Sequence, residues 1–253
     1  MDLGLAGKRA IVTGGSRGIG RRIVDLLLAD GCHVGFCARG KEQVDSTVAE
    51  IAATDAEVLG GVADVTDDAG FRRWIAVTAT ALGGLDILVA NASALVASAD
   101  MDAWRLGLEV DVLGTVRAVE AALPFLEDSD AASIVAISST AAVNTSGGVR
   151  AYSGLKAALI SYMSGLSTNL ATKGIRANTV SPGAIFFEGG VWDVRKREAP
   201  DAYAAAVARN PMGRLGTPEE VANAVVFLAS PAASYISGTN VIVDGAATTR
   251  IQY

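Results

Sequence analysis

Residues 9–20 read RAIVTGGSRGIG, and this stretch decides the fold. Its first five residues form a short apolar run typical of a buried strand, and the residues from position 18 onward have the apolar spacing of an amphipathic helix. Glycines at positions 14, 18 and 20 leave the backbone bare where the strand turns into the helix. A diphosphate can approach main-chain N–H groups at such a helix start. The alternative is a tight loop without a ligand, but the place of the turn between a first strand and a first helix favours nucleotide binding.

The rest of the chain repeats this alternation. Strands are expected at 9–13, 33–38, 57–62, 85–90, 133–138, 175–180 and 240–243, and helices at 18–29, 41–52, 69–81, 101–125, 151–172 and 217–229. Strands rich in Val, Ile and Leu that alternate with helices indicate a parallel sheet covered on both faces. We therefore expect one α/β domain over residues 1–253, with a doubly wound sheet and right-handed crossovers. Residues 182–211 read as irregular, and the segment around 184–212 is predicted to be a lid over a ligand (the lid segment).

Composition narrows the function classes. Hydrophobic residues make up 51% of the 253 residues and the net charge is −6, so a large core can form and nothing attracts the chain to nucleic acid. No long apolar run suggests a signal peptide or a membrane span. One His and two Cys make a metal site improbable, and we expect Cys32 and Cys37 to be free core residues of a cytoplasmic protein.

The end of the second expected strand bears on which nicotinamide cofactor is used. A carboxylate there would bind the adenosine ribose and repel a 2′-phosphate. The sequence has Cys37-Ala38-Arg39-Gly40 instead, and Arg17 adds a second cation in the glycine turn. Both arginines could be ordinary surface residues. The presence of these cations and the absence of a carboxylate at the end of the strand nevertheless favour NADP(H). Asp64, after the third strand, either accepts from the adenine amino group or caps the following helix.

Proton transfer is expected from Tyr152 and Lys156. They are four residues apart, which places them on one face of the expected helix. Free tyrosine has a pKa near 10, and a nearby ammonium favours tyrosinate and general acid–base work. Hydroxyls at the end of the preceding strand, in Ile137-Ser138-Ser139-Thr140, lie at the same sheet edge as the glycine turn and can bind a substrate oxygen, although strand-end hydroxyls often only form turns.

Taken in order, these motifs resemble the short-chain dehydrogenase/reductase family over nearly the whole chain. The matching segments are TGGSRGIG at 13–20, Asp64-Val65, Ala90-Asn91-Ala92-Ser93, Ser139, Tyr152 with Lys156, and Ser181-Pro182-Gly183. The resemblance implies a Rossmann-type fold, Tyr152 as acid/base, Lys156 as its activator and Ser139, thirteen residues before Tyr152, as the group that orients the substrate oxygen. It also implies the following cofactor-binding residues: Gly14, Ser16, Arg17, Gly18, Ile19, Gly20, Arg39, Asp64, Val65, Asn91, Ala92, Ser93, Tyr152, Lys156, Pro182, Gly183 and Ile185.

Three positions depart from the family pattern. Ser93 replaces a glycine that keeps the backbone close to the cofactor, and Phe187 replaces a threonine that contacts the carboxamide. The aromatic Phe187 indicates either an apolar, ring-bearing substrate or a lid that packs on its own domain. Asp111 replaces an asparagine that braces Lys156 through a water. As an anion, Asp111 should offset part of the ammonium's effect, so we expect a higher pH optimum for oxidation than in an Asp111→Asn variant.

The sequence therefore predicts an NADP(H)-dependent oxidoreductase acting on a small carbonyl or alcohol substrate, with a 3-oxoacyl reductase as a variant. Basic residues 195–197 could form a rim for an acidic carrier or a solvated lid face. The competing hypothesis is a cofactor-binding sensor or scaffold without turnover. The resemblance also implies a homotetramer, or a homodimer, assembled through the two long helices expected at 101–125 and 151–172.

Overall fold

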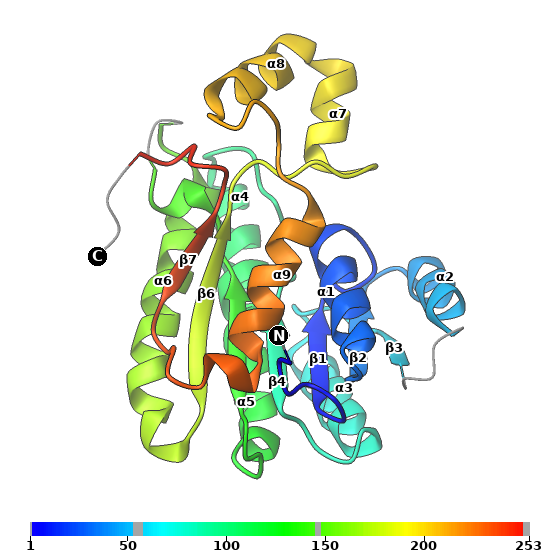
Figure 1. Ribbon diagram of the computed structural model, residues 1–253. Helices are drawn as coiled ribbons and strands as arrows, with labels where there is room; N and C mark the ends of the chain where they lie inside the picture. The colour runs from blue at the N-terminus through cyan, green and yellow to red at the C-terminus, as the bar shows by residue number, and fades with distance from the viewer. Residues whose placement is uncertain (1, 53–57, 145–147, 250–253) are drawn as a thin grey trace.

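The computed structural model describes residues 2–52, 58–144 and 148–249. In these residues seven parallel strands form one sheet in the order β3-β2-β1-β4-β5-β6-β7 (Figure 1). The order runs outward from β1 in both directions, which is the doubly wound topology that the sequence predicts. The strands are β1 Arg9–Thr13, β2 His33–Ala38, β3 Val58–Val62, β4 Ile87–Ala90, β5 Ser133–Ile137, β6 Arg176–Pro182 and β7 Asn240–Val243.

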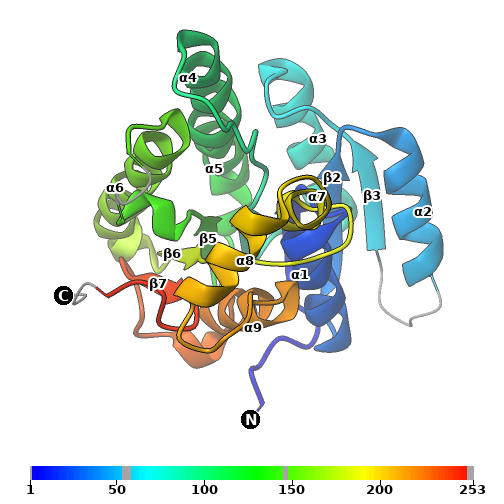
Figure 2. The same cartoon turned by 90° about the horizontal axis from the view of Figure 1, so that it is seen from above.

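Helices cover both faces of the sheet (Figure 2). One face carries α1 Gly18–Ala29, α2 Lys41–Ile51 and α9 Pro218–Ala229, and the other carries α3 Asp68–Ala81, α5 Gly114–Leu126 and α6 Ala151–Leu170. Each face buries its own apolar cluster, because the strands point alternate side chains to opposite sides. Within the described ranges, no helix combines the length and apolarity needed to cross a bilayer.

The long helix expected at 101–125 is interrupted. It consists of α4 Met101–Gly107, a π-helical turn η1 Leu108–Leu113 and α5 Gly114–Leu126. Glycines flank the turn because neighbours come close: a Cβ at Gly107 would lie 2.6 Å from Leu155, and one at Gly114 would lie 3.0 Å from Val65. A π-helical turn inside a helix is rare and often marks a functional site.

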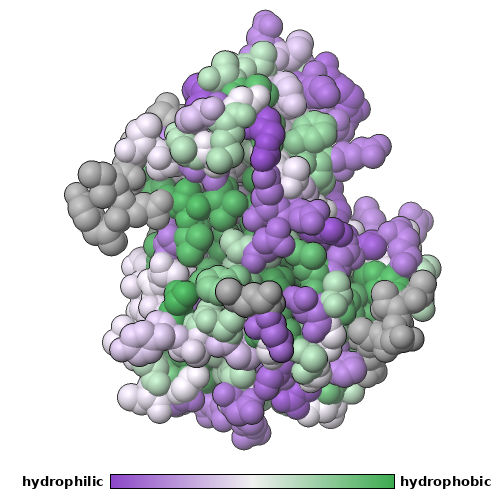
Figure 3. Space-filling view, viewed as in Figure 1, coloured by the Kyte–Doolittle hydropathy of each residue, from purple (hydrophilic) through white to green (hydrophobic). Residues whose placement is uncertain are grey.

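The sequence suggested an irregular lid segment, and this prediction is wrong. The lid segment contains α7 Val191–Glu198 and α8 Pro200–Arg209, two short helices above the carboxyl ends of the strands (Figure 1). In Figure 3 hydrophobic surface gathers below these helices on the side of the C-terminus, and the surface is hollowed between them and α2. The other expected elements differ from the structure by at most two residues at their ends, and Glu57 lies outside the described residues.

The two cysteines are free and buried, as predicted. Burial raises the pKa of both the Cys32 and the Cys37 thiol to about 12. Both thiols therefore stay protonated at neutral pH and act as small core side chains.

Candidate functional site

The glycine turn between β1 and α1 has the shape of an anion site. Gly14 and Gly18 have φ of +69° and +56°, a region that favours glycine. A Cβ at Gly20 would overlap the Gly14 carbonyl oxygen and the Asn91 side chain, so only glycine fits there. The residue that precedes α1, Arg17, makes no side-chain cap, and the first turn carries no acid. The N–H groups of the first turn of α1 can therefore receive a diphosphate, and the site fits a dinucleotide.

Asn91, the residue directly after β4, braces this turn. Its amide nitrogen Nδ2 donates to the carbonyl oxygens of Thr13 and Gly14, both at 3.0 Å. The hydroxyl of Thr13 accepts in return from the backbone N–H groups of Asn91 and Ala92. The family resemblance implies that Asn91 binds the cofactor, and the role of Thr13 was missed. The position of this threonine directly before the glycines was the available signal.

Asp64, which follows β3, does not cap the helix that comes after it. Its Oδ1 accepts from the backbone N–H of Thr66 at 2.9 Å and from the Thr66 hydroxyl at 2.8 Å, while Asp67 caps α3. Of the two alternatives for Asp64, the helix cap is therefore wrong. Arg39, directly after β2, and Arg17, in the glycine turn, are both exposed.

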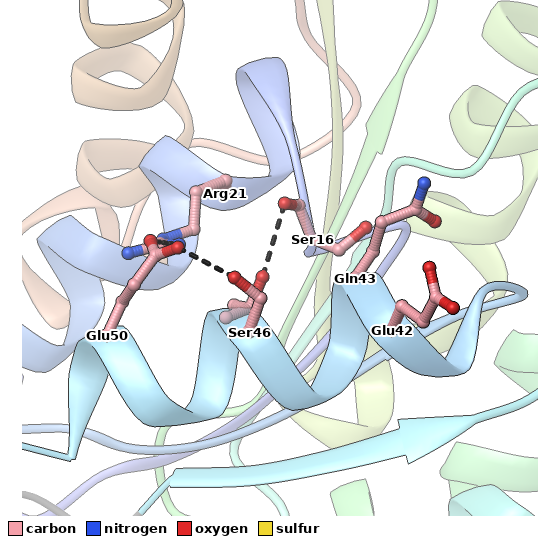
Figure 4. A pocket seen from close by; sticks show the side chains of 7 residues that line it. Ser16, Arg21, Glu42, Gln43, Ser46 and Glu50 are labelled. Carbon is pink, nitrogen blue, oxygen red and sulfur yellow. Dashed lines mark hydrogen bonds and ion pairs between the residues drawn. The ribbon is translucent and has the colours of Figure 1, made fainter.

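A pocket of about 290 Å³ lies beside the glycine turn, between α1 and α2 (Figure 4). The Thr47 hydroxyl donates to the Ser16 carbonyl oxygen across it, at 3.3 Å. Arg21 is ion-paired with Glu50 at 2.7 Å and with Asp25 at 2.8 Å. Arg21 is neutralised in this way, whereas Arg17 and Arg39 form no ion pair within the part of the chain that the structure describes.

Tyr152 and Lys156 lie on the first two turns of α6. The Lys156 side chain is only 2% exposed, and its Nζ lies 5.7 Å from the centre of the Tyr152 ring. Nζ donates to the carbonyl oxygen of Ile137, the last residue of β5, at 2.9 Å. The ammonium is thus fixed between the sheet edge and the tyrosine, as general acid–base chemistry requires.

Asp111 contacts Lys156 directly. Its Oδ1 lies 2.9 Å from Nζ, and both side chains are 2% exposed. The resemblance implied a water between these positions, and the structure replaces it with an ion pair. Asp111 lies in the π-helical turn η1, while the Thr115 hydroxyl donates to its backbone carbonyl oxygen at 2.7 Å.

The two serines after β5 have different roles. Ser138 is buried, and its hydroxyl donates to the Lys156 carbonyl oxygen at 2.8 Å, which ties α6 to the sheet edge. Ser139 is half-buried, and its hydroxyl oxygen accepts from the N–H of Ala141 at 3.1 Å. Ser138 is therefore engaged in structure, whereas the Ser139 hydroxyl proton has no acceptor among the described residues.

The segment after β6 forms the other wall of the site. The N–H of Gly183 donates to the Val243 carbonyl oxygen at 2.9 Å, and Ile185 pairs with Gly216 in a parallel bridge. In that bridge the residues on either side of Ile185 make the hydrogen bonds to Gly216. The N–H and carbonyl of Ile185 therefore point to the opposite side, as required of a backbone that meets a carboxamide.

Phe187 packs on the glycine turn. A Cβ at Gly18 would lie 2.6 Å from the ring atom Cζ, and one at Gly190 would lie 2.8 Å from it. Of the two interpretations of this residue, the contact favours a lid that packs on its own domain.

The basic residues of the lid segment are also engaged locally. The Lys196 Nζ lies 5.3 Å from the Phe186 ring centre, the Arg195 guanidinium lies 4.6 Å from that of Trp192, and Arg197 pairs with Asp193 at 3.4 Å. These contacts favour a solvated lid face over a rim for an acidic carrier.

Comparisons with known proteins agree with this geometry. A model of the family described as enoyl-(acyl carrier protein) reductase matches residues 14–248. The chain is 37% identical to isoepoxydon dehydrogenase patN of Penicillium expansum over 97% of this chain and 96% of that protein. It is 34% identical to dehydrogenase/reductase SDR family member 4 of Oryctolagus cuniculus over 98% of this chain and 96% of that protein. The crystal structure of gox2181 superimposes with a TM-score of 0.91 at 30% identity, covering 98% of both chains.

Proposed function

Because this chain belongs to the short-chain dehydrogenase/reductase family, whose members bind a nicotinamide cofactor, we propose that it is an NADP(H)-dependent oxidoreductase of hydrophobic carbonyl compounds or secondary alcohols. One observation carries the proposal. The Tyr152–Lys156 pair and the uncapped N-terminus of α1 lie at the same carboxyl edge of the sheet. Cofactor and proton donor can therefore meet at one place.

The residues of the chain divide the chemistry between them. The cofactor supplies or accepts the hydride when bound. Tyr152 gives a proton to the carbonyl oxygen in reduction and takes it back in oxidation, and the Lys156 ammonium is held beside its ring. The Ser139 hydroxyl orients the substrate oxygen. The turn from Gly14 to Gly20 binds the diphosphate, and Ile185 binds the carboxamide through its backbone.

Arg39 and Arg17 select NADP(H) over NAD(H). A guanidinium that binds the 2′-phosphate makes charge-assisted hydrogen bonds worth about 1.5–3 kcal/mol each. We expect the wild type to bind NADPH more tightly than NADH, and Arg39→Ala to weaken NADPH binding by roughly tenfold or more with little change for NADH. Fluorescence titration of both cofactors measures this. Equal affinities in the wild type would refute the selection of NADP(H).

The substrate is expected to be hydrophobic. The lid segment, which lies above the carboxyl ends of the strands, carries the aromatic residues Phe186 and Trp192. A panel of cyclic, aromatic and linear ketones, followed by NADPH absorbance, tests the class. A preference for a 3-oxoacyl thioester over all of them would favour the acyl-reductase variant.

The alternative is a cofactor-binding sensor or scaffold without turnover. The buried Lys156 and the tyrosine beside it favour the enzyme. NADPH binding without oxidation or reduction of any compound in the panel would favour the sensor.

We also propose assembly into a homotetramer through α5 and α6. The outer face of α6 exposes small residues, Gly154, Ala158 and Gly165 among them, and Leu106 and Leu108 are exposed next to it on α4 and η1. A flat face of small residues suits close helix packing across a symmetric interface. Light scattering after size-exclusion chromatography measures the mass, and a monomer would refute the proposal.

A further inference from the structure

Ser93 and Asp111 both depart from the family pattern, and the structure joins them. The Ser93 hydroxyl donates to Oδ1 of Asp111 at 2.6 Å, although the residues lie in different elements, the loop after β4 and the turn η1. The glycine that the family carries at position 93 has no side chain and cannot make this bond. The two departures therefore form one structural unit.

Three donors converge on the Asp111 carboxylate. Oδ1 accepts from the Ser93 hydroxyl and faces Nζ of Lys156, and Oδ2 accepts from the N–H of Ala94 at 2.9 Å. A carboxylate has only acceptor sites, whereas an asparagine would turn its NH₂ toward one of these donors. The surroundings of position 111 thus suit Asp and do not suit the Asn that the family usually has there.

The loop that carries Ser93 is held in a costly backbone conformation. Leu95 has φ of +50°, in the left-handed region, and its N–H donates to the Ser93 hydroxyl oxygen at 3.2 Å. A side chain of this kind enters that region only when surrounding contacts impose it. Ser93 accepts from Leu95 and donates to Asp111, so its hydroxyl links the strained loop to the buried ion pair.

On the basis of the function proposed above, we propose that Ser93 is a positioning residue for Lys156 and acts through Asp111. Its hydroxyl fixes the Asp111 carboxylate against Nζ, which sets how much of the ammonium charge reaches Tyr152. In the described residues, the charged or titratable side chains that face Nζ are Asp111 from η1 and Tyr152 from α6, and β5 contributes the Ile137 carbonyl.

A double-mutant cycle tests this link through the pH–rate profile of alcohol oxidation. Asp111→Asn should move the rising limb to lower pH, because a carboxylate no longer offsets the charge of the ammonium that lies beside Tyr152. Ser93→Ala should move it the same way by a smaller amount and lower kcat several-fold. In the Asp111→Asn background, Ser93→Ala should change neither the profile nor kcat. Equal effects of Ser93→Ala in both backgrounds, or no shift in either, would overturn the proposal.

Matched variants separate positioning from general damage. Ser93→Thr keeps a hydroxyl and should keep the wild-type profile, and Ser93→Gly with Asp111→Asn restores the family pair and should behave as Asp111→Asn. Ser98→Ala, in the same loop but bonded to Asp100, should leave the profile unchanged. A shift in Ser98→Ala as large as that in Ser93→Ala would mean that any loop mutation moves the site.

A second readout does not need turnover. The NADPH dissociation constant, measured across a range of pH, reports on the surroundings of Lys156, which is one of the expected cofactor-binding residues. The cycle should show the same coupling there: Ser93→Ala alters the pH dependence only when Asp111 is present. If the wild type oxidises no alcohol, the proposed function fails, and this binding cycle still decides whether Ser93 acts through Asp111.

Discussion

Lys156 has a structural role as the partner of Asp111 and a chemical role beside Tyr152. Comparing Lys156→Met with Tyr152→Phe separates the two roles. Lys156→Met leaves the Asp111 carboxylate buried without its cation, and loss of one partner of a buried pair costs about 3–5 kcal/mol. Tyr152→Phe removes only a hydroxyl, so it should keep the unfolding free energy within about 1 kcal/mol while kcat falls by roughly 10²–10⁴. Urea unfolding and steady-state kinetics of the two variants measure both quantities. Equal stabilities would show that Lys156 does not hold Asp111.

How far these residues could be predicted depends on how local their geometry is. Tyr152 and Lys156 are one helical turn apart, so their spacing alone placed them on one face of a helix. The direct contact of Asp111 with Lys156 was missed, because it depends on the π-helical turn. Closely packed glycines, Gly107 and Gly114, flank that turn, and inside a helical pattern these glycines look ordinary. The hydrogen bond from Ser93 to Asp111 involves the same turn and could not be predicted from the sequence either.

Among the elements, strands and helices of the sheet layers were predicted well and the lid segment was not. The ends of β1, α1 and β2 agree with the sequence because glycines and apolar runs mark them. In the lid segment, α7 is short and mostly polar, with Arg195, Lys196 and Arg197 in its last turn. A helix held by local ring and charge contacts gives no clear apolar period, so its pattern resembles a loop.

We expect the lid segment to control access to the N-terminus of α1 as well. Phe187 packs on Gly18 at the helix start, so a diphosphate that binds the N–H groups must displace its ring. We expect Phe187→Ala to bind NADPH about three- to tenfold more tightly, since that contact of about 1 kcal/mol no longer has to be broken. Phe186→Ala, whose ring packs on Tyr203 instead, is the control. Weaker binding by Phe187→Ala in titrations would mean that the ring packs on the bound cofactor.

Arg176 fastens the end of α9 to the sheet. Its buried guanidinium donates to the carbonyl oxygens of Leu228 at 2.6 Å, Ala229 at 3.1 Å and Ser230 at 3.0 Å. A cation at a helix C-terminus satisfies carbonyls that have no partner inside the helix. Arg176→Met should lower the unfolding free energy by about 3 kcal/mol, because several buried carbonyls lose their donor. Thermal unfolding measures this, and a melting temperature equal to that of the wild type would contradict it.

At the scale of the whole molecule, Asp86 forms a small network of polar contacts at the edge of the sheet opposite the candidate site. Its side chain is 2% exposed, pairs with Arg9 at 2.8 Å and accepts from the Ser129 hydroxyl at 2.6 Å. Burial alone would raise the pKa of Asp86, but the bonds from Arg9 and Ser129 outweigh it and hold that pKa below its ordinary value. These contacts therefore make the folded state favour the ionised carboxyl.

The sign of the pH dependence follows from that shift. A carboxyl whose pKa is lower in the folded state contributes stability above its unfolded pKa of about 3.9, and this contribution is lost as the pH falls through the folded value. Asp86→Asn should lose about 2–4 kcal/mol at pH 7 because Arg9 is left without its anion. The difference between wild type and variant should shrink as the pH falls below about 4. Urea unfolding from pH 7 to pH 3 measures both curves, and a constant difference would show that Asp86 contributes by packing and not by charge.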